Sequence, residues 1–388
     1  MSSPDLTDAE RQAVMEVLNT PNLAMGPKID AFEEAIAHFS GAKHAIAVNS
    51  GTSGLHLCVH AAGIKQNDLV VTTPFSFIAS TNVILFEKGI PVFVDVDPLT
   101  GNIDPLKAAA AVRDVQAGGA RAKAWLPRKG AEHAGPLKAM LAVDVFGQPA
   151  DYDELRKVTD GAGIKLIEDS CESLGSEYKG KKAGLFGETA VFAFYPNKQI
   201  TTGEGGIVVT NDDEADHYIR ALRSQGRAPG DTWLQHTFMG YNYRMDEMSA
   251  ALGLAQMGRI EELINKRQKV AEWYEERLSE INGVEVPVVV KETTRMSWFV
   301  YVVRFDAAIN RDQLAEKLKE RGIPVRPYFI PIHLQPYMME QFGYRRGDFP
   351  VTEDLGDRGL SLPFSGVMTE DQVEIVCETL RDCIAHKG

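Results

Sequence analysis

Short apolar segments alternate with helical segments between residues 44 and 210, and this alternation restricts the fold more than any other feature. HAIAVN (44–49) and DLVVTTP (68–74) have the composition of buried strands, and TSGLHLCVHAAG (52–63) between them has that of a helix. Such alternation indicates an α/β fold with a mostly parallel sheet covered on both faces. Ligands of these sheets bind beyond the carboxyl ends of the strands. The expected strands cover residues 44–49, 68–74, 91–97, 140–147, 164–170, 189–195 and 206–212.

The length of 388 residues predicts two domains. The sheet segments and an N-terminal arm predict a large α/β domain over residues 1–250. A long charged segment (246–281) has the pattern of one bridging helix, and it leads into a smaller α+β domain over residues 251–388. Residues 113–138 are rich in glycine, alanine and basic residues, and we interpret them as an extended surface loop.

The chain carries 54 acidic and 41 basic residues, a net charge of −13. This balance argues against a nucleic-acid partner, but it leaves room for a locally positive pocket that binds a small anion. No apolar run approaches the roughly 20 residues that span a bilayer, so no membrane partner is expected. The N-terminus, MSSPDLTDAE, lacks a secretory signal pattern, and the four cysteines form no CxxC pair. We therefore expect a cytoplasmic protein with reduced thiols.

The segment NSGTSGLHL (49–57) joins an expected strand to an expected helix. Gly51, Thr52 and Ser53 would place backbone N–H groups and two hydroxyls at a helix N-terminus, where the helix dipole favours an anion. Serine and threonine are also the usual capping residues, and the motif matches neither GxGxxG nor the P-loop. A phosphate site and a simple N-cap are both consistent with this segment.

Two further segments follow expected strands. LIEDSCESLG (166–175) places Asp169 at a buried strand end, where a carboxylate requires a cation or strong hydrogen bonds unless it only begins a helix. Glu172 follows three residues later. FYPNKQITTGEGG (194–206) can be a glycine-rich phosphate loop, a flexible turn, or the support for a reactive Lys198. Most lysines are solvated, but one beside aromatic residues can have a lowered pKa that suits Schiff-base chemistry.

Together the three segments provide what pyridoxal phosphate (PLP) requires. They offer an anion site for its phosphate, an acid for its ring nitrogen and a lysine for its aldehyde. Phe77, at the junction after the second strand, is either a core residue or an aromatic side chain that stacks on the ring. The combination indicates a PLP-dependent enzyme.

The order of five motifs along the chain resembles that of a known family. The motifs are GTSGLHL, PFSFIASTN, EDSCESLGS, FYPNKQITTGEGGIVVTND and GYNYRMDEMSAALGLAQM. In this order they resemble the DegT/DnrJ/EryC1/StrS family of sugar-nucleotide aminotransferases, from about Gly26 to the C-terminal MTEDQVEIV. The resemblance implies PLP fold-type I, the fold of aspartate aminotransferase-like enzymes. It also implies PLP as the cofactor and a homodimer with shared active sites.

The resemblance assigns roles to particular residues. Lys198 would form the Schiff base with the cofactor and act as the general base, and Asp169 would pair with the pyridine nitrogen. Phe77 would stack on the ring, Glu172 would lie near the ring hydroxyl, and Asn242 would reach the phosphate of the neighbouring subunit's cofactor. The phosphate would bind at Gly51, Thr52 and Ser53, and the sugar at Tyr328 and His333.

The implied reaction is transfer of an amino group from an amino acid, L-glutamate, to a keto-sugar nucleotide. ESLGS and RPYFIPIH are most similar to the branch that aminates C4 of a 4-keto-6-deoxyhexose nucleotide, as in perosamine-type synthesis. Such enzymes serve amino-sugar and polysaccharide biosynthesis. The alternatives are a PLP-dependent sugar dehydratase, in which histidine replaces the lysine, and a non-catalytic regulatory protein on the same scaffold. An aldolase or desulfurase of the same fold is disfavoured by GYNYRM.

The chain departs from the pattern of the family in three places. Ala193 stands where relatives often have a serine that contacts the phosphate, and its absence removes one hydrogen bond to a charged group, worth roughly 1.5–3 kcal/mol. Asp144 stands where many relatives have histidine, which leaves the substrate open. The segment 113–138 is longer than usual. His56 and His60 have a metal-binding spacing, but no third ligand is evident and no metal is expected.

Overall fold

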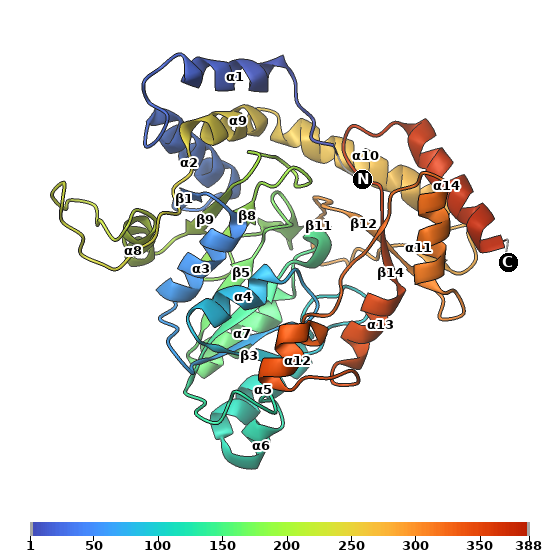
Figure 1. Cartoon of the computed structure of the whole chain (residues 1–388), viewed down its shortest axis with the longest axis horizontal. Coiled ribbons are helices and arrows are strands. Elements are labelled where there is room, and N and C mark those ends of the chain that lie inside the picture. Colours follow the sequence, from blue (N-terminus) through green and yellow to red (C-terminus); the bar gives the residue numbers. More distant parts are fainter. Residues whose placement is uncertain (1–2, 386–388) are drawn as a thin grey trace.

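The computed structural model describes residues 3–385, so the first two and the last three residues of the predicted domain ranges lie outside it. A seven-stranded sheet forms the centre of the large domain (Figure 1). In spatial order its strands are β1 (His44–Val48), β9 (Gly206–Thr210), β8 (Thr189–Ala193), β5 (Lys165–Asp169), β4 (Leu137–Val143), β2 (Leu69–Thr72) and β3 (Ile90–Phe93). Strand β9 is antiparallel to both of its neighbours, and the remaining pairs are parallel. The predicted α/β fold with a mostly parallel sheet is confirmed.

Helices cover both faces of this sheet, because alternate residues of each strand point to opposite sides. On β4, Leu141 belongs to a buried cluster with α3, α4 and α8, whereas the adjacent Met140 packs with α5 and α7. At the β1 end, α2 and α9 cover the second face around Phe192. The helices are α1 (Asp8–Leu18), α2 (Pro27–Ser40), α3 (Gly51–Ala61), α4 (Ala79–Phe86), α5 (Pro105–Ala117), α6 (Gly119–Lys123), α7 (Tyr152–Ala162), α8 (Asp213–Arg223) and α9 (Glu247–Met257).

The C-terminal part of the chain forms a second core around a four-stranded sheet. Its strands, in spatial order, are β10 (Val284–Glu285), β12 (Tyr301–Phe305), β14 (Gly359–Leu362) and β13 (Arg326–Pro327). Helices α10 (Ile260–Leu278), α11 (Arg311–Glu320) and α14 (Glu370–Ala385) pack in this core, whereas α12 (Pro336–Phe342) and α13 (Pro350–Arg358) pack against the buried clusters of the large sheet. A small third sheet consists of β11 (Thr293–Arg295), β6 (Glu177–Tyr178) and β7 (Lys181–Lys182). The division between residues 250 and 251 stays a prediction.

Two predicted elements are wrong in detail. The single helix over 246–281 is two helices, because Arg259 leaves the helical conformation between α9 and α10 (Figure 1). Its side chain forms ion pairs with Asp5, Glu10 and Glu262 at this break. Residues 113–138 are not wholly a loop, because their alanine-rich first part completes α5 and forms α6, in keeping with the high helix propensity of alanine. No helix within residues 3–385 is both long and apolar enough to cross a bilayer.

Candidate active site

A cavity of about 460 Å³ lies at the carboxyl ends of β5 and β8, where the strand pattern predicts ligand binding. Most of the predicted site residues line it, and they come from segments that are far apart in the sequence. These are Gly51, Thr52, Phe77, Asp169, Glu172, Lys198 and Tyr328. Ser53, Asn242 and His333 are not among the lining residues.

The N-terminus of α3 forms one wall of the cavity. Ser50 is the N-cap of this helix, and its hydroxyl accepts the backbone N–H of Ser53 at 3.1 Å. The Ser53 hydroxyl donates to the side chain of Asn49 at 2.7 Å, so it serves the turn itself. Gly51 packs so closely against β8 that a Cβ atom would stand 2.7 Å from that of Ala193. The capping role therefore belongs to Ser50, and the helix start beside Thr52 remains available to an anion.

Asp169 ends β5 and is almost fully buried. One carboxylate oxygen accepts a hydrogen bond from the Ser80 hydroxyl at 2.6 Å, and the other accepts the backbone N–H of Cys171 at 3.3 Å. No cation is paired with this carboxylate in the described part of the chain. A buried carboxylate with this environment suits a protonated ring nitrogen as its partner. Ser80 was not predicted, since nothing in its own segment distinguishes it from a helical serine.

Lys198 lies after β8 in a largely buried position. Its Nζ is 3.5 Å from Glu172 Oε1 and 3.7 Å from the centre of the Phe299 ring. The second oxygen of Glu172 accepts the backbone N–H of Phe146 at 2.9 Å. Burial raises the pKa of the Glu172 carboxyl, and the positive charge of Lys198 opposes that rise. The lysine therefore has one carboxylate and one aromatic face as neighbours, not bulk water.

The backbone around Lys198 is held by Arg267 of α10, which is buried and has no carboxylate partner among the described residues. Its guanidinium donates to the carbonyl oxygens of Asn197 and Lys198 on one side. On the other side it donates to those of Trp298 and Phe299 at 3.3 and 3.2 Å. Burial lowers the pKa of this guanidinium to about 10. Arg267 thus ties the lysine segment to the segment that carries Phe299.

The remaining predicted residues occupy different places. Phe77 is 61% exposed and faces the cavity, so it is not a core residue. Asn242 is exposed outside the cavity, and its backbone oxygen accepts a hydrogen bond from Asn49 at 3.5 Å. His333 is fully buried and lies 2.9 Å from Glu353, so the structure does not bring it to the cavity as the resemblance implied. The RPYFIPIH motif predicted that His333 would lie at the sugar site, but it could not predict which way the side chain points.

Asp144 has a structural environment and does not line the cavity. Its carboxylate is fully buried and accepts hydrogen bonds from the hydroxyls of Tyr152, Ser170 and Ser173 at 2.6 to 2.8 Å. Burial raises its pKa to about 6, although these hydrogen bonds counteract the rise. The expectation that this position bears on the substrate is therefore not supported by a contact.

The rings of His56 and His60 also form hydrogen bonds with other side chains of the fold. His56 contacts Glu87 at 2.7 Å and the Tyr243 hydroxyl at 3.0 Å, and His60 contacts the Tyr218 hydroxyl at 2.9 Å. Across residues 3–385, no three His, Cys, Asp or Glu side chains are grouped so as to hold a metal ion.

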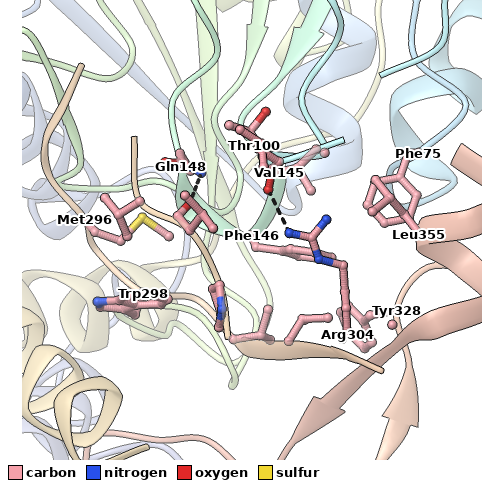
Figure 2. Close-up of a pocket in the computed structure, with 18 residues that line it drawn as sticks. Phe75, Thr100, Val145, Phe146, Gln148, Met296, Trp298, Arg304, Tyr328 and Leu355 are labelled. Atoms are coloured by element: carbon pink, nitrogen blue, oxygen red, sulfur yellow. Dashed lines mark hydrogen bonds between the residues drawn. The ribbon is translucent and has the colours of Figure 1, made fainter. Parts of the chain in front are cut away.

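A second cavity, of about 50 Å³, lies between the two cores and shares Tyr328 with the first (Figure 2). Its lining is mostly apolar. The Nε2 of Gln148 donates to the carbonyl oxygen of Val288 at 3.1 Å, and Arg304 donates to that of Leu99 at 3.3 Å. Since the chain itself satisfies these polar groups, this cavity is a packing gap beside the site and not a second reaction centre.

Comparison with known proteins agrees with this geometry. Residues 4–381 match the DegT/DnrJ/EryC1/StrS aminotransferase family. The chain belongs to this family. GDP-perosamine synthase from Caulobacter vibrioides is 36% identical over 383 residues, which cover 98% of this chain and 96% of that protein. Another relative, the spore coat polysaccharide biosynthesis protein SpsC from Bacillus subtilis, is 35% identical, with 99% of this chain and 96% of that protein covered.

A solved structure shows the same similarity in three dimensions. It is that of Helicobacter pylori PseC, an aminotransferase involved in the biosynthesis of pseudoaminic acid. It matches with a TM-score of 0.88 and 28% identity, and the match covers 99% of this chain and 98% of that one. The predicted resemblance to sugar aminotransferases of PLP fold-type I is confirmed.

Aminotransferases of this family use PLP, and the cavity has the groups to hold it. The start of α3 can bind the phosphate, and Gly51 has no Cβ because the strand beside it leaves no space for one. The unpaired Asp169 carboxylate can hold the ring nitrogen, and exposed Phe77 can cover the ring. Lys198 lines the same cavity, where its amine can reach the aldehyde.

Proposed function

We propose that this aminotransferase moves an amino group from L-glutamate to C4 of a nucleotide-linked 4-keto-6-deoxyhexose. The observation that carries the proposal is the meeting of Lys198, Asp169 and the α3 N-terminus in one cavity. The similarity to GDP-perosamine synthase supports the choice of sugar. Such a reaction belongs to amino-sugar and polysaccharide biosynthesis, as the name of the relative SpsC also suggests.

When bound, PLP supplies an electron sink for the carbanion that forms at the reacting carbon. Lys198 removes the proton from the donor's Cα through Nζ, and in the second half-reaction it delivers a proton to C4 of the sugar. Glu172 Oε1 lies 3.5 Å from that Nζ and orients it toward the cavity. Asp169 would accept a hydrogen bond from the protonated ring nitrogen and so keep that nitrogen charged.

We further propose that the active unit is a homodimer. Asn242 is exposed and lies outside the cavity of its own chain, which is the position required of a residue that reaches the neighbouring subunit's phosphate. Tyr328 lines the cavity from the C-terminal core and is the proposed contact with the sugar. The four cysteines are free thiols, in keeping with a cytoplasmic location.

The two alternative functions make different use of the same cavity. A sugar dehydratase of this family carries histidine at the lysine position, whereas this chain has Lys198 beside Glu172. A regulatory protein would not need a buried, unpaired Asp169 facing an open cavity. Neither alternative has an observation of its own in the structure.

The absorption spectrum of the purified protein with PLP tests the proposal. We expect a visible band from cofactor bound to Lys198, which disappears when excess L-glutamate is added and is absent in Lys198→Ala. A subsequent addition of a nucleotide-linked 4-keto-6-deoxyhexose should restore the band. A band that ignores glutamate and other amino acids would contradict amino transfer and favour the dehydratase. Absence of any band in the wild-type protein would favour the regulatory alternative.

A further inference from the structure

Arg326 places a second positive charge in the cavity. It lies on β13, where it pairs with Ser361 of β14, and Tyr328 follows two residues later. Both residues line the cavity that contains Lys198. The C-terminal core therefore presents a guanidinium to the reaction centre.

The Arg326 guanidinium has no hydrogen-bond or ion-pair partner within the described residues, whereas the side chains of Lys198 and Asp169 are engaged. Lys198 pairs with Glu172, and Asp169 accepts hydrogen bonds from Ser80 and from the backbone of Cys171. Among residues 3–385, no hydrogen bond or ion pair joins the side chain of Arg326 to another residue. Once Lys198 is occupied by the cofactor, Arg326 is the remaining cation of the lining.

Arg326 shares the cavity lining with Tyr328, whose pKa reflects the charges around it. Burial raises the pKa of Tyr328 to about 12; the charge of Glu172 adds to this rise, and the charge of Arg326 opposes it. The pKa of Tyr328 therefore depends on the charges of both Arg326 and Glu172, and Glu172 contacts Lys198.

This position distinguishes between the two anionic substrates of the proposed function. The α-carboxylate of an amino acid is attached directly to the carbon from which Lys198 takes the proton. The diphosphate of a sugar nucleotide is separated from the C4 keto group by the sugar ring. An arginine that lines the same cavity as Lys198 therefore fits this carboxylate, which its planar fork can bind through two parallel hydrogen bonds.

We propose that Arg326 binds the α-carboxylate of the amino donor and so selects amino acids as donors. This inference rests on the proposed function, because it assigns the donor's position in that reaction. Glu204 lines the cavity as well, and its negative charge disfavours the donor carboxylate on its own side. The donor is therefore held from the C-terminal core, and the sugar nucleotide enters against the remaining walls.

The test is an equilibrium titration of the PLP-loaded enzyme with 2-methyl-L-glutamate, which keeps the α-carboxylate but has no proton at Cα to lose. Binding is followed by the change in the visible spectrum, so the result does not depend on turnover. We expect Arg326→Gln to weaken binding about 10- to 100-fold, the loss of a charged bidentate contact. Arg326→Lys should bind 2-methyl-L-glutamate with an affinity between those of the wild type and of Arg326→Gln. Arg381→Gln, an exposed arginine on α14, is the control and should bind as the wild type does.

Substrate kinetics then separate the carboxylate from the diphosphate. In Arg326→Gln we expect KM for L-glutamate to rise and KM for the keto-sugar nucleotide to stay within about twofold. The loss should persist with L-glutamine as donor, because glutamine retains the α-carboxylate but lacks the side-chain carboxylate. Unchanged binding of 2-methyl-L-glutamate, a loss confined to the sugar nucleotide, or a loss that vanishes with glutamine would each overturn the inference. A wild-type spectrum that ignores glutamate would instead refute the proposed function.

Discussion

Replacing Gly51 with alanine introduces a methyl group at the point where α3 begins beside β8. The new Cβ atom would stand 2.7 Å from the Cβ of Ala193 and 3.1 Å from Sγ of Cys171. Carbon atoms in favourable contact are about 3.5–4.0 Å apart, so the helix start, the strand or both must move by nearly 1 Å. The helix start is also the proposed phosphate site, so this displacement acts directly on the cofactor.

The size of the effect follows from the packing. Overfilling a close-packed contact costs roughly 1–3 kcal/mol, of which the lower backbone entropy of alanine recovers up to about 1 kcal/mol. We therefore expect Gly51→Ala to lower the free energy of unfolding of the apoprotein by about 1–2 kcal/mol. If the helix start moves to relieve the overlap, the dissociation constant for PLP should rise by at least about tenfold, since a charge-assisted hydrogen bond is worth that much.

Urea denaturation of the apoprotein and fluorescence titration with PLP measure the two quantities. Ala193→Gly in the same chain removes the nearer of the two opposing atoms, so it provides a matched rescue. The double variant should be less destabilised than the sum of the single variants by about 1 kcal/mol or more. If Gly51→Ala destabilises the protein equally with and without Ala193, the overlap with Ala193 is not the cause. If it leaves PLP binding unchanged, the phosphate does not bind at the start of α3.

Two further predictions concern carboxylates. Asp169→Asn should retain PLP but lower the rate of the glutamate half-reaction, followed by single-turnover absorbance, by about 10²-fold or more, because a neutral amide does not keep the ring nitrogen charged. Burial alone raises the pKa of Glu10, but hydrogen bonds from Thr7, Gln256 and Arg259 outweigh it and lower this pKa to about 2. Its ionised form therefore adds stability above the unfolded pKa near 4.3, and up to about 3 kcal/mol is lost as the pH falls toward 2. Urea denaturation between pH 6 and 3 should show a flatter pH dependence for Glu10→Gln, and equal slopes would contradict the assignment.

The strands could be predicted because each is a short apolar run bounded by polar residues. The helix boundaries were harder to predict where one helix directly follows another. The apolar periodicity of 246–281 does not mark the break, which lies at Gly258 and Arg259, and the partners of Arg259 there, Asp5 and Glu10, come from the other end of the chain. The loop predicted over 113–138 is wrong in its first part. Glycine and basic residues suggest a loop there, but the alanines between them favour helix.

The residues of the candidate site likewise fall into those that the sequence predicts and those that it does not. Lys198 and Asp169 could be predicted because both follow apolar strands of one sheet, which places them at a common edge. Ser80 and Arg267 could not, since each acts on a residue that is distant in the sequence, Asp169 and the backbone of Lys198 respectively. Motif position alone placed His333 beside the sugar, but the direction of a side chain depends on its packing, and this ring turns to Glu353.

The four carbonyl contacts of Arg267 have a consequence for anyone who wishes to redesign this enzyme. The guanidinium binds the Lys198 segment and the Phe299 segment at once, so we expect a substitution that moves the cavity wall at Phe299 to displace the lysine as well. Substrate range and turnover are therefore not independent variables here. Libraries that vary the wall should vary α10 around Arg267 together with it, and should keep the arginine, because a lysine cannot span both segments with a single ammonium group.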